Sequence, residues 1–241
     1  MLGTGNALVT RCYNTCFAIQ DDDEYFLVDA GGGNGIMRQL QDAGIPMEQI
    51  HHIFLTHEHT DHLLGMIWMI RMIATKIRKE QYEGNLRIYC HSALVETVRT
   101  IANLTLPKKF TRLLDHRIQF VPLHNGDTKR LRNGQKLTCA GDEPLNEQCV
   151  GYAESSDWLM HEAFCLYSQR NQYDPYEKHH STVREACELA SCLNVPNLIL
   201  YHTEDDNIER RKALYTAEGR LYYKGNLYVP DDLECIEFDE V

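Results

Sequence analysis

The sequence predicts an α/β protein, because short apolar runs typical of strands alternate with longer amphipathic segments typical of helices over its 241 residues. Two further observations favour this class. Polar, titratable clusters follow the ends of several apolar runs, and the carboxyl edge of the sheet is where α/β proteins build their sites. The chain also has no linker rich in Pro, Ser or Gly, so we expect residues 1–241 to form a single domain.

The first half begins with a predicted hairpin, in which the runs TCFAIQ and EYFLVDA flank the polar turn DDD. The segment GGGNG then opens a helix that ends near Gly44 and Pro46. We expect a strand at HHIFLT, a long core-packed helix at LLGMIWMIRMIATKIRKE, a strand at LRIYC, a helix that begins at an N-cap Ser92, and a strand at RIQFVPL. GGGNG lacks the Lys-Ser/Thr of a nucleotide-binding loop, so its glycines indicate close backbone packing, with direct phosphate contact as the alternative.

The second half has the same alternation of elements. QKLTCAGDEP predicts a strand that runs into a turn, and DWLMHEAFC predicts another strand. STVREACELASCLN predicts a helix capped by Ser181 or Thr182, and NLILYHTEDD predicts a strand that ends in acids.

Composition limits the function. The formal net charge is -11 and the pI is near 5.5, so the chain has no electrostatic footprint for bulk nucleic-acid binding. Nine scattered cysteines, an odd number, indicate a reduced, cytoplasmic protein rather than a disulfide framework. No signal peptide and no apolar run of about 18 residues is visible, so we expect no membrane partner.

The segment IFLTHEHTDHLLG places three histidines, a glutamate and an aspartate within six positions directly after an apolar run. A strand end is rigid and can hold side chains in the fixed geometry that a metal requires. His57, His59 and His62 offer imidazole nitrogens, and Asp61 adds a carboxylate oxygen, which together suit zinc. The pattern indicates two metal ions, whereas the alternative is a solvated loop or part of a tag.

The stretch THEHTDHLLG resembles the metal-binding signature of the metallo-β-lactamase superfamily. This resemblance covers essentially the whole chain and implies a four-layer αββα sandwich of two mixed sheets flanked by helices. Within the superfamily the sequence is most similar to the ribonuclease Z-like branch. LGTGNA, VDAGGG, GDEP, HEAFC, HHST and LILYHTED occur in the order that this branch uses.

The resemblance implies a ligand set for two divalent metal ions, with Zn²⁺ as the expected metal and Mn²⁺ or Fe as alternatives. The implied ligands are His57 and His59 on the first metal, Asp61 and His62 on the second, Asp142 as a bridge, and His202 as the last ligand of the second metal. From the residues alone, Asp142 after a glycine is equally compatible with a turn.

The resemblance also assigns two catalytic roles: His180 is the implied general acid, and Glu162 is its implied partner. In the two-metal mechanism we expect Asp61 also to orient the attacking water. An apolar strand that carries Glu162 must satisfy its charge, and a histidine would do so. From the residues alone, His180 would be a surface residue near a helix cap.

These roles predict a two-metal hydrolase that cleaves phosphodiester bonds with a metal-bridging hydroxide. The partner is a phosphodiester substrate, RNA or a small nucleotide, and the branch implies a homodimer. The chain lacks the basic Gly- and Pro-rich arm of tRNA-processing members, and HTEDDN departs from their Ser-x-Arg-Tyr continuation, so we favour a small or different phosphodiester. One alternative is a hydrolase of a carboxylic ester, lactone or thioester, and another is a metal-binding or sensor protein without turnover.

The chain is short of one implied ligand. Ribonuclease Z-like enzymes use a further histidine on the first metal, on a loop before the Gly-Asp motif. His91, His116 and His124 are available there, and His124 lies at the most suitable strand end. Its neighbours NGD are typical of an ordinary turn. We therefore expect a further segment near Thr128 to Arg130 to carry the missing histidine, with His124 as its substitute otherwise.

Overall fold

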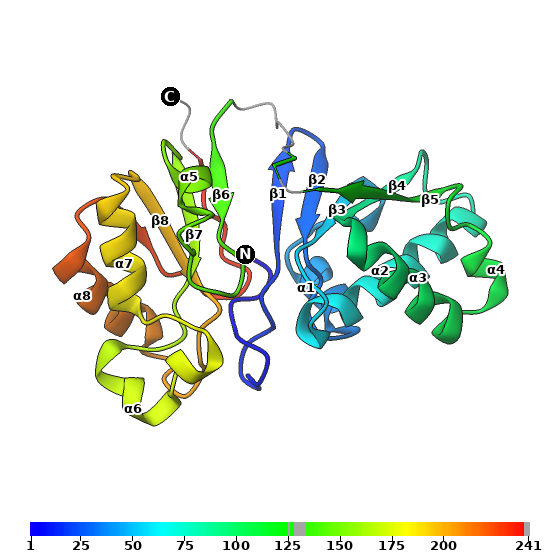
Figure 1. Ribbon diagram of the computed structural model, residues 1–241. Helices are drawn as coiled ribbons and strands as arrows, with labels where there is room; N and C mark the ends of the chain where they lie inside the picture. Colours follow the sequence, from blue (N-terminus) through cyan, green and yellow to red (C-terminus); the bar gives the residue numbers. More distant parts are fainter. Residues whose placement is uncertain (125, 128–133, 239–241) are drawn as a thin grey trace. The chain divides into compact units, whose positions relative to one another are not determined.

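The computed structural model describes residues 1–124, 126–127 and 134–238, and the chain divides into two compact units (Figure 1). The described part of the first unit comprises residues 1–3, 13–124, 126–127 and 235–238, and that of the second comprises residues 4–12 and 134–234. That the two units form a single domain stays a prediction.

The first unit is built on a mixed sheet, which within the described residues has the strand order β1-β2-β3-β4-β5. Its strands are β1 (Phe17–Asp21), β2 (Glu24–Val28), β3 (Ile50–Leu55), β4 (Leu86–His91) and β5 (Ile118–Leu123). β1 and β2 form the antiparallel hairpin that the DDD turn predicts, and the other neighbours are parallel. Burial alternates along β4, so one of its faces packs into the core.

Helices of the first unit bury the apolar side chains of this sheet. They are α1 (Gly35–Asp42), η1 (Met47–Gln49), α2 (Thr60–Arg78), α3 (Ser92–Thr105) and α4 (Lys108–Thr111). α2 and α3 lie side by side and contact the sheet (Figure 1). Met66, Met69 and the isoleucines of α2 belong to the hydrophobic core of the first unit, which confirms the packing predicted for most of this helix, whereas Trp68 is exposed.

The second unit contains a sheet of order β6-β7-β8-β9, with every pair parallel in the part of the chain that the structure describes. Its strands are β6 (Leu137–Cys139), β7 (Trp158–Glu162), β8 (Asn197–Tyr201) and β9 (Asn226–Tyr228). All five residues of β7 are buried, as expected for a central strand covered on both faces. The sequence predicts two mixed sheets; here the second is parallel because its strands are joined by crossovers rather than a hairpin.

The helices of the second unit are α5 (Val150–Ala153), η2 (Tyr167–Gln169), α6 (Arg170–Tyr173), η3 (Tyr176–Lys178), α7 (Val183–Cys192) and α8 (Arg211–Tyr222). α7 and α8 pack against each other and against the sheet (Figure 1). Thr182 caps α7 in a capping box with Glu185, which resolves the choice between Ser181 and Thr182.

Some local predictions differ from the structure. Ser92 is the first residue of α3 rather than its cap, because the His91 side chain accepts a hydrogen bond from the backbone N–H of Ala93. The backbone N–H of His124 donates to the Asp127 carboxylate at 2.8 Å, a local contact typical of turns. The expected histidine-bearing segment is absent: the sequence is continuous through Thr128 to Arg130, which lie outside the described residues, and has no histidine between His124 and His161.

The length and polarity of the helices bear on membrane insertion. Among the residues that the structure describes, each helix is too short or too polar to cross a bilayer.

Candidate functional site

Asp29 organises the histidine cluster of the first unit. It follows β2 and has a left-handed backbone with φ of +57°, a conformation in which non-glycine residues are uncommon. Its Oδ1 accepts a hydrogen bond from the Thr56 backbone N–H at 2.8 Å. Its Oδ2 accepts from the Thr56 hydroxyl at 2.7 Å and from His62 Nδ1 at 2.8 Å. One carboxylate therefore fixes both the end of β3 and the ring of His62.

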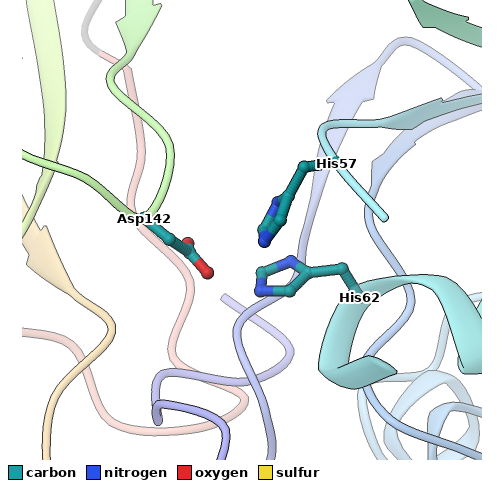
Figure 2. Close-up of side chains that lie close together, drawn as sticks. All are labelled: His57, His62 and Asp142. Atoms are coloured by element: carbon teal, nitrogen blue, oxygen red, sulfur yellow. The ribbon is translucent and has the colours of Figure 1, made fainter. Parts of the chain in front are cut away.

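These hydrogen bonds also assign the protons on two histidine rings. The Thr56 hydroxyl donates its hydrogen to Asp29, so its oxygen must accept from His57 Nδ1, which lies 3.0 Å away. His57 and His62 therefore both carry their proton on Nδ1, which leaves the Nε2 lone pairs as ligand atoms. The two rings lie close together, with centroids 4.2 Å apart (Figure 2).

His59 and Asp61 complete the cluster of the first unit. His59 is the N-cap residue of α2, and its Nδ1 lies 2.9 Å from His57 Nε2. Asp61 lies in the first turn of α2, and its Oδ2 is 3.3 Å from His62 Nε2. The structure thus brings these four predicted residues together within one unit. Imidazole nitrogens and a carboxylate oxygen that point at one another are a donor set that fits a divalent zinc-like cation.

Glycines near the cluster allow close backbone packing. Gly65 of α2 donates its backbone N–H to Gly31 O at 2.8 Å, and a Cβ at Gly65 would lie only 1.8 Å from Ala30 O. Gly31 has a φ of +69°, and a Cβ there would lie 2.4 Å from the Tyr13 ring. The GGGNG loop therefore serves to hold α2 close to Asp29, and phosphate contact by this loop stays a hypothesis.

Asp142 and His202 lie together in the second unit. Asp142 is in the loop after β6, and His202 directly follows β8 with a φ of +56°. His202 Nδ1 lies 3.3 Å from Asp142 Oδ2. The close approach of these two donors is again compatible with a shared cation.

The N-terminal segment fixes the residue after His202. Thr203 pairs with this segment as a parallel β-bridge: its N–H donates to Thr4 O, and its carbonyl accepts from the Asn6 N–H, both at 3.0 Å. The buried Arg211 guanidinium donates to the hydroxyls of Thr203 and Thr4, at 2.8 and 2.9 Å. The LGTGNA motif thus holds the unusual backbone of His202 in place.

His180 lies close to both residues. Its Nδ1 donates to the Asp142 carbonyl oxygen at 2.8 Å, and its ring centroid is 5.1 Å from that of His202. Because a carbonyl can only accept, Nδ1 carries a proton and Nε2 is the ring atom that can exchange one. Burial lowers the pKa of His180, against the opposing effect of the Asp142 carbonyl.

Glu162 is fully buried at the end of β7, and Ser181 satisfies one of its oxygens. Glu162 Oε1 accepts from the Ser181 backbone N–H at 2.5 Å and from its hydroxyl at 2.7 Å. Oε2 lies 3.7 Å from His180 Nδ1, beyond hydrogen-bond distance. The predicted partnership is therefore mainly indirect: Glu162 holds the residue next to His180. Burial raises the pKa of Glu162 to about 8.

Sequence reasoning missed Asp29, Thr56 and Ser181. The available signal for Asp29 was an acid directly after the apolar run EYFLV, the same signal that marked the histidine cluster. The sequence has no comparable signal for Thr56 and Ser181, because each hydroxyl donates to a carboxylate that is distant in the sequence.

The fold is that of the metallo-β-lactamase superfamily, and the chain is similar to its ribonuclease Z-like branch. The metallo-β-lactamase fold protein YhfI from Bacillus subtilis has a TM-score of 0.75 and 16% identity, with 96% of this chain and 95% of that chain covered. Human tRNase Z, short form, has a TM-score of 0.71 and 18% identity, covering 98% and 97%. Both likenesses confirm the predicted fold.

A curated relative supports the same branch. Ribonuclease Z from Methanothermobacter thermautotrophicus is 26% identical over 298 aligned positions, which cover 98% of this chain and 95% of the relative. Since 298 positions exceed the 241 residues of this chain, the relative contains segments that have no counterpart here.

The particular family follows from a model that matches residues 1–188 and is described as Anti-Pycsar protein Apyc1. The chain belongs to this family.

Proposed function

We propose that this protein is a two-metal phosphodiesterase that cleaves a small nucleotide-like phosphodiester, in the anti-Pycsar role that the family description names. The observation that carries the proposal is His180, a histidine with its Nδ1 engaged by a carbonyl and its Nε2 left to exchange a proton. A ligand set alone would serve a metal-binding protein, whereas a positioned acid is needed for turnover.

The proposed ligands are those that the family resemblance implies. They are His57, His59, Asp61, His62, Asp142 and His202. When bound, two divalent cations, Zn²⁺ in the first place and Mn²⁺ or Fe otherwise, would supply Lewis-acid stabilisation of phosphate charge and an activated water. The hydrogen bonds of Asp29 and Thr56 support this proposal, because they orient two Nε2 atoms as ligands.

The other residues have separate roles. His180 would donate a proton from Nε2 to the departing oxygen, which is most valuable when the leaving group is an unactivated alcohol. Glu162 would hold His180 in place through Ser181. Asp61 would orient the attacking water through its carboxylate.

A small substrate fits the chain better than tRNA. The net charge is -11, whereas phosphate contacts from Lys and Arg dominate nucleic-acid affinity. The ribonuclease Z relative also has segments that this chain lacks.

The cellular setting is also part of the proposal. The nine cysteines, all of which lie in the described part of the chain, form no disulfide, which supports a reducing, cytoplasmic location. A homodimer, which the branch implies, is also part of the proposal.

A parallel assay of the Zn²⁺-loaded protein tests the function. The substrates are bis(p-nitrophenyl) phosphate, a 3′,5′-cyclic nucleotide, a precursor tRNA and a lactone. We expect turnover of the first two, with little on the tRNA and none on the lactone.

The matched variants are His57→Ala, which should abolish turnover, and His116→Ala, which removes an exposed histidine and should not. Efficient 3′ trimming of the tRNA at physiological salt would overturn the small-substrate assignment. Turnover of the lactone alone would replace the phosphodiesterase by the carboxylic-ester alternative.

A further inference from the structure

Phe164 stacks on the ring of His180. The two ring centroids are 4.7 Å apart and the planes differ by only 5°, a parallel arrangement. Phe164 lies two residues beyond Glu162 and is 7% exposed. Neither the ligand set nor the proton transfer described above uses this side chain.

The position of Phe164 is fixed by its backbone. Its N–H donates to Ser181 O at 3.0 Å, and its carbonyl accepts from the Glu204 N–H at 2.9 Å and from the Tyr215 hydroxyl at 3.1 Å. The ring of Tyr173 contacts the Phe164 ring edge to face, with centroids 6.3 Å apart. Phe164 is therefore a rigid surface, and Ser181, its hydrogen-bond partner, is also the residue that Glu162 holds.

The hydrogen bond at Nδ1 does not by itself fix the orientation of the His180 ring plane. A single hydrogen bond to the Asp142 carbonyl fixes the position of Nδ1 but allows the ring plane to turn about that bond. Turning the plane would swing Nε2, on the far side of the ring, away from a leaving oxygen. A flat neighbour in parallel contact removes this freedom, because turning would lose the stacking contact or produce a clash.

We propose that Phe164 is a positioning residue that sets the plane of the His180 imidazole and so directs Nε2 towards the departing oxygen of the substrate. The inference rests on the proposed function, in which His180 is the general acid. The direction of the proton donor matters only when the leaving group needs a proton. Replacing Phe164 should therefore slow the cleavage of unactivated diesters selectively.

The test compares Phe164→Leu with the wild type on two substrates. For a 3′,5′-cyclic nucleotide, whose leaving group is a ribose alkoxide, we expect kcat to fall on the order of tenfold with KM nearly unchanged, part of the general-acid contribution. For bis(p-nitrophenyl) phosphate, whose leaving group needs little protonation, kcat should change by less than about twofold. Phe164→Tyr keeps the ring and should restore turnover of the cyclic nucleotide.

A second readout does not need activity. In proton NMR, the carbon-bound ring protons of His180, identified by their loss in His180→Ala, should lie upfield because of the Phe164 ring current. They should move downfield in Phe164→Leu. Phe110→Leu removes a similarly buried ring from the core of the first unit, and it should leave the signals and the substrate ratio unchanged.

The outcomes separate the two hypotheses. If His180→Ala shows the loss on the cyclic nucleotide alone but Phe164→Leu does not, the positioning role is wrong and the function stands. If His180→Ala reduces turnover of both substrates equally, the general-acid role fails and the proposal for Phe164 fails with it. Unchanged His180 signals in Phe164→Leu would refute the stacking contact itself.

Discussion

Asp29 connects three chain positions through one carboxylate, and it accounts for the orientation of two proposed ligands. It accepts a hydrogen bond from His62 directly and reaches His57 through the Thr56 hydroxyl. Partners of this kind fix the tautomer and the ring orientation of histidine ligands. Asp29 is therefore expected to control metal affinity without being a ligand.

Asp29→Asn should weaken Zn²⁺ binding by roughly 10- to 100-fold, as replacement of such partners typically does. The substitution turns one acceptor oxygen into an NH₂ donor, which must face either the Thr56 backbone N–H or the Thr56 hydroxyl and His62 Nδ1, so the hydrogen bonds that place the two rings are disturbed. Competition with a chromophoric chelator measures the change. Asp42→Asn, at an exposed ion pair with Arg38, is the control and should bind as the wild type does. Equal affinities for both variants would refute the orienting role.

Among single residues, the sequence predicted the contiguous ones best. His57, His59, Asp61 and His62 lie within one short segment, so the strand end that carries them places all four together. Asp29 and Phe164 act through contacts that form only when β2 pairs with β3, or when the chain after β7 meets the start of α7. Such contacts have no periodic or local signature in the sequence.

The start of α2 carries Asp61 and His62, and its position depends on Gly65. The helix approaches the Ala30–Gly31 backbone so closely that a Cβ would lie 1.8 Å from Ala30 O. Helix propensity alone favours alanine over glycine by about 1 kcal/mol. Close packing therefore predicts that Gly65→Ala lowers the free energy of unfolding, whereas helix propensity predicts that it raises it.

We predict that packing decides, so Gly65→Ala should lower the free energy of unfolding by roughly 1–3 kcal/mol, the usual cost of overpacking. Thermal unfolding measures the effect. Gly33→Ala is the control, because a Cβ there would have no atom within 4 Å, and it should be nearly neutral. A stabilised Gly65→Ala variant would contradict the close approach.

Glu162, at the end of β7, gives the protein a specific pH dependence. The folded protein holds the Glu162 proton up to about pH 8, whereas the ordinary pKa of 4.5 applies in the unfolded chain. Between these values the folded state binds more protons than the unfolded state, so stability falls as pH rises from 4.5 to 8.

Glu162→Gln removes this titration, so its unfolding temperature should fall less between pH 5 and pH 8 than that of the wild type. Differential scanning calorimetry of metal-free protein at several pH values measures the difference. Glu188→Gln, at an exposed residue of α7, should follow the wild type. Parallel pH profiles for the wild type and Glu162→Gln would show that burial does not hold the proton.

Elements with strong periodicity were predictable, and short or polar ones were not. The hairpin, α2, β3 and α7 lie where apolar spacing and capping residues indicate them. α8 and β9 were not predicted: α8 carries Gly219 in its interior, and β9 is only three residues long. Their contacts with α7 and β8 stabilise them instead, and that tertiary contribution is not visible in local sequence.

At the scale of the whole chain, the fold class and the branch were predictable from the sequence, whereas the family was not. The alternation of elements predicted α/β structure, and the motifs from LGTGNA to LILYHTED predicted the ribonuclease Z-like branch, both confirmed by the comparisons. The anti-Pycsar family was not predicted, because the motifs that the sequence reasoning used belong to the whole branch.

The most direct measurement of the central claim is a Zn²⁺ titration of metal-free protein with turnover of bis(p-nitrophenyl) phosphate as the readout. The proposed ligand set predicts that turnover rises until two Zn²⁺ are bound per chain, counted by elemental analysis of the same samples. His57→Ala and His202→Ala should each lose turnover and bind less metal. Full turnover at one Zn²⁺ per chain, or turnover that persists in the presence of excess chelator, would contradict the account.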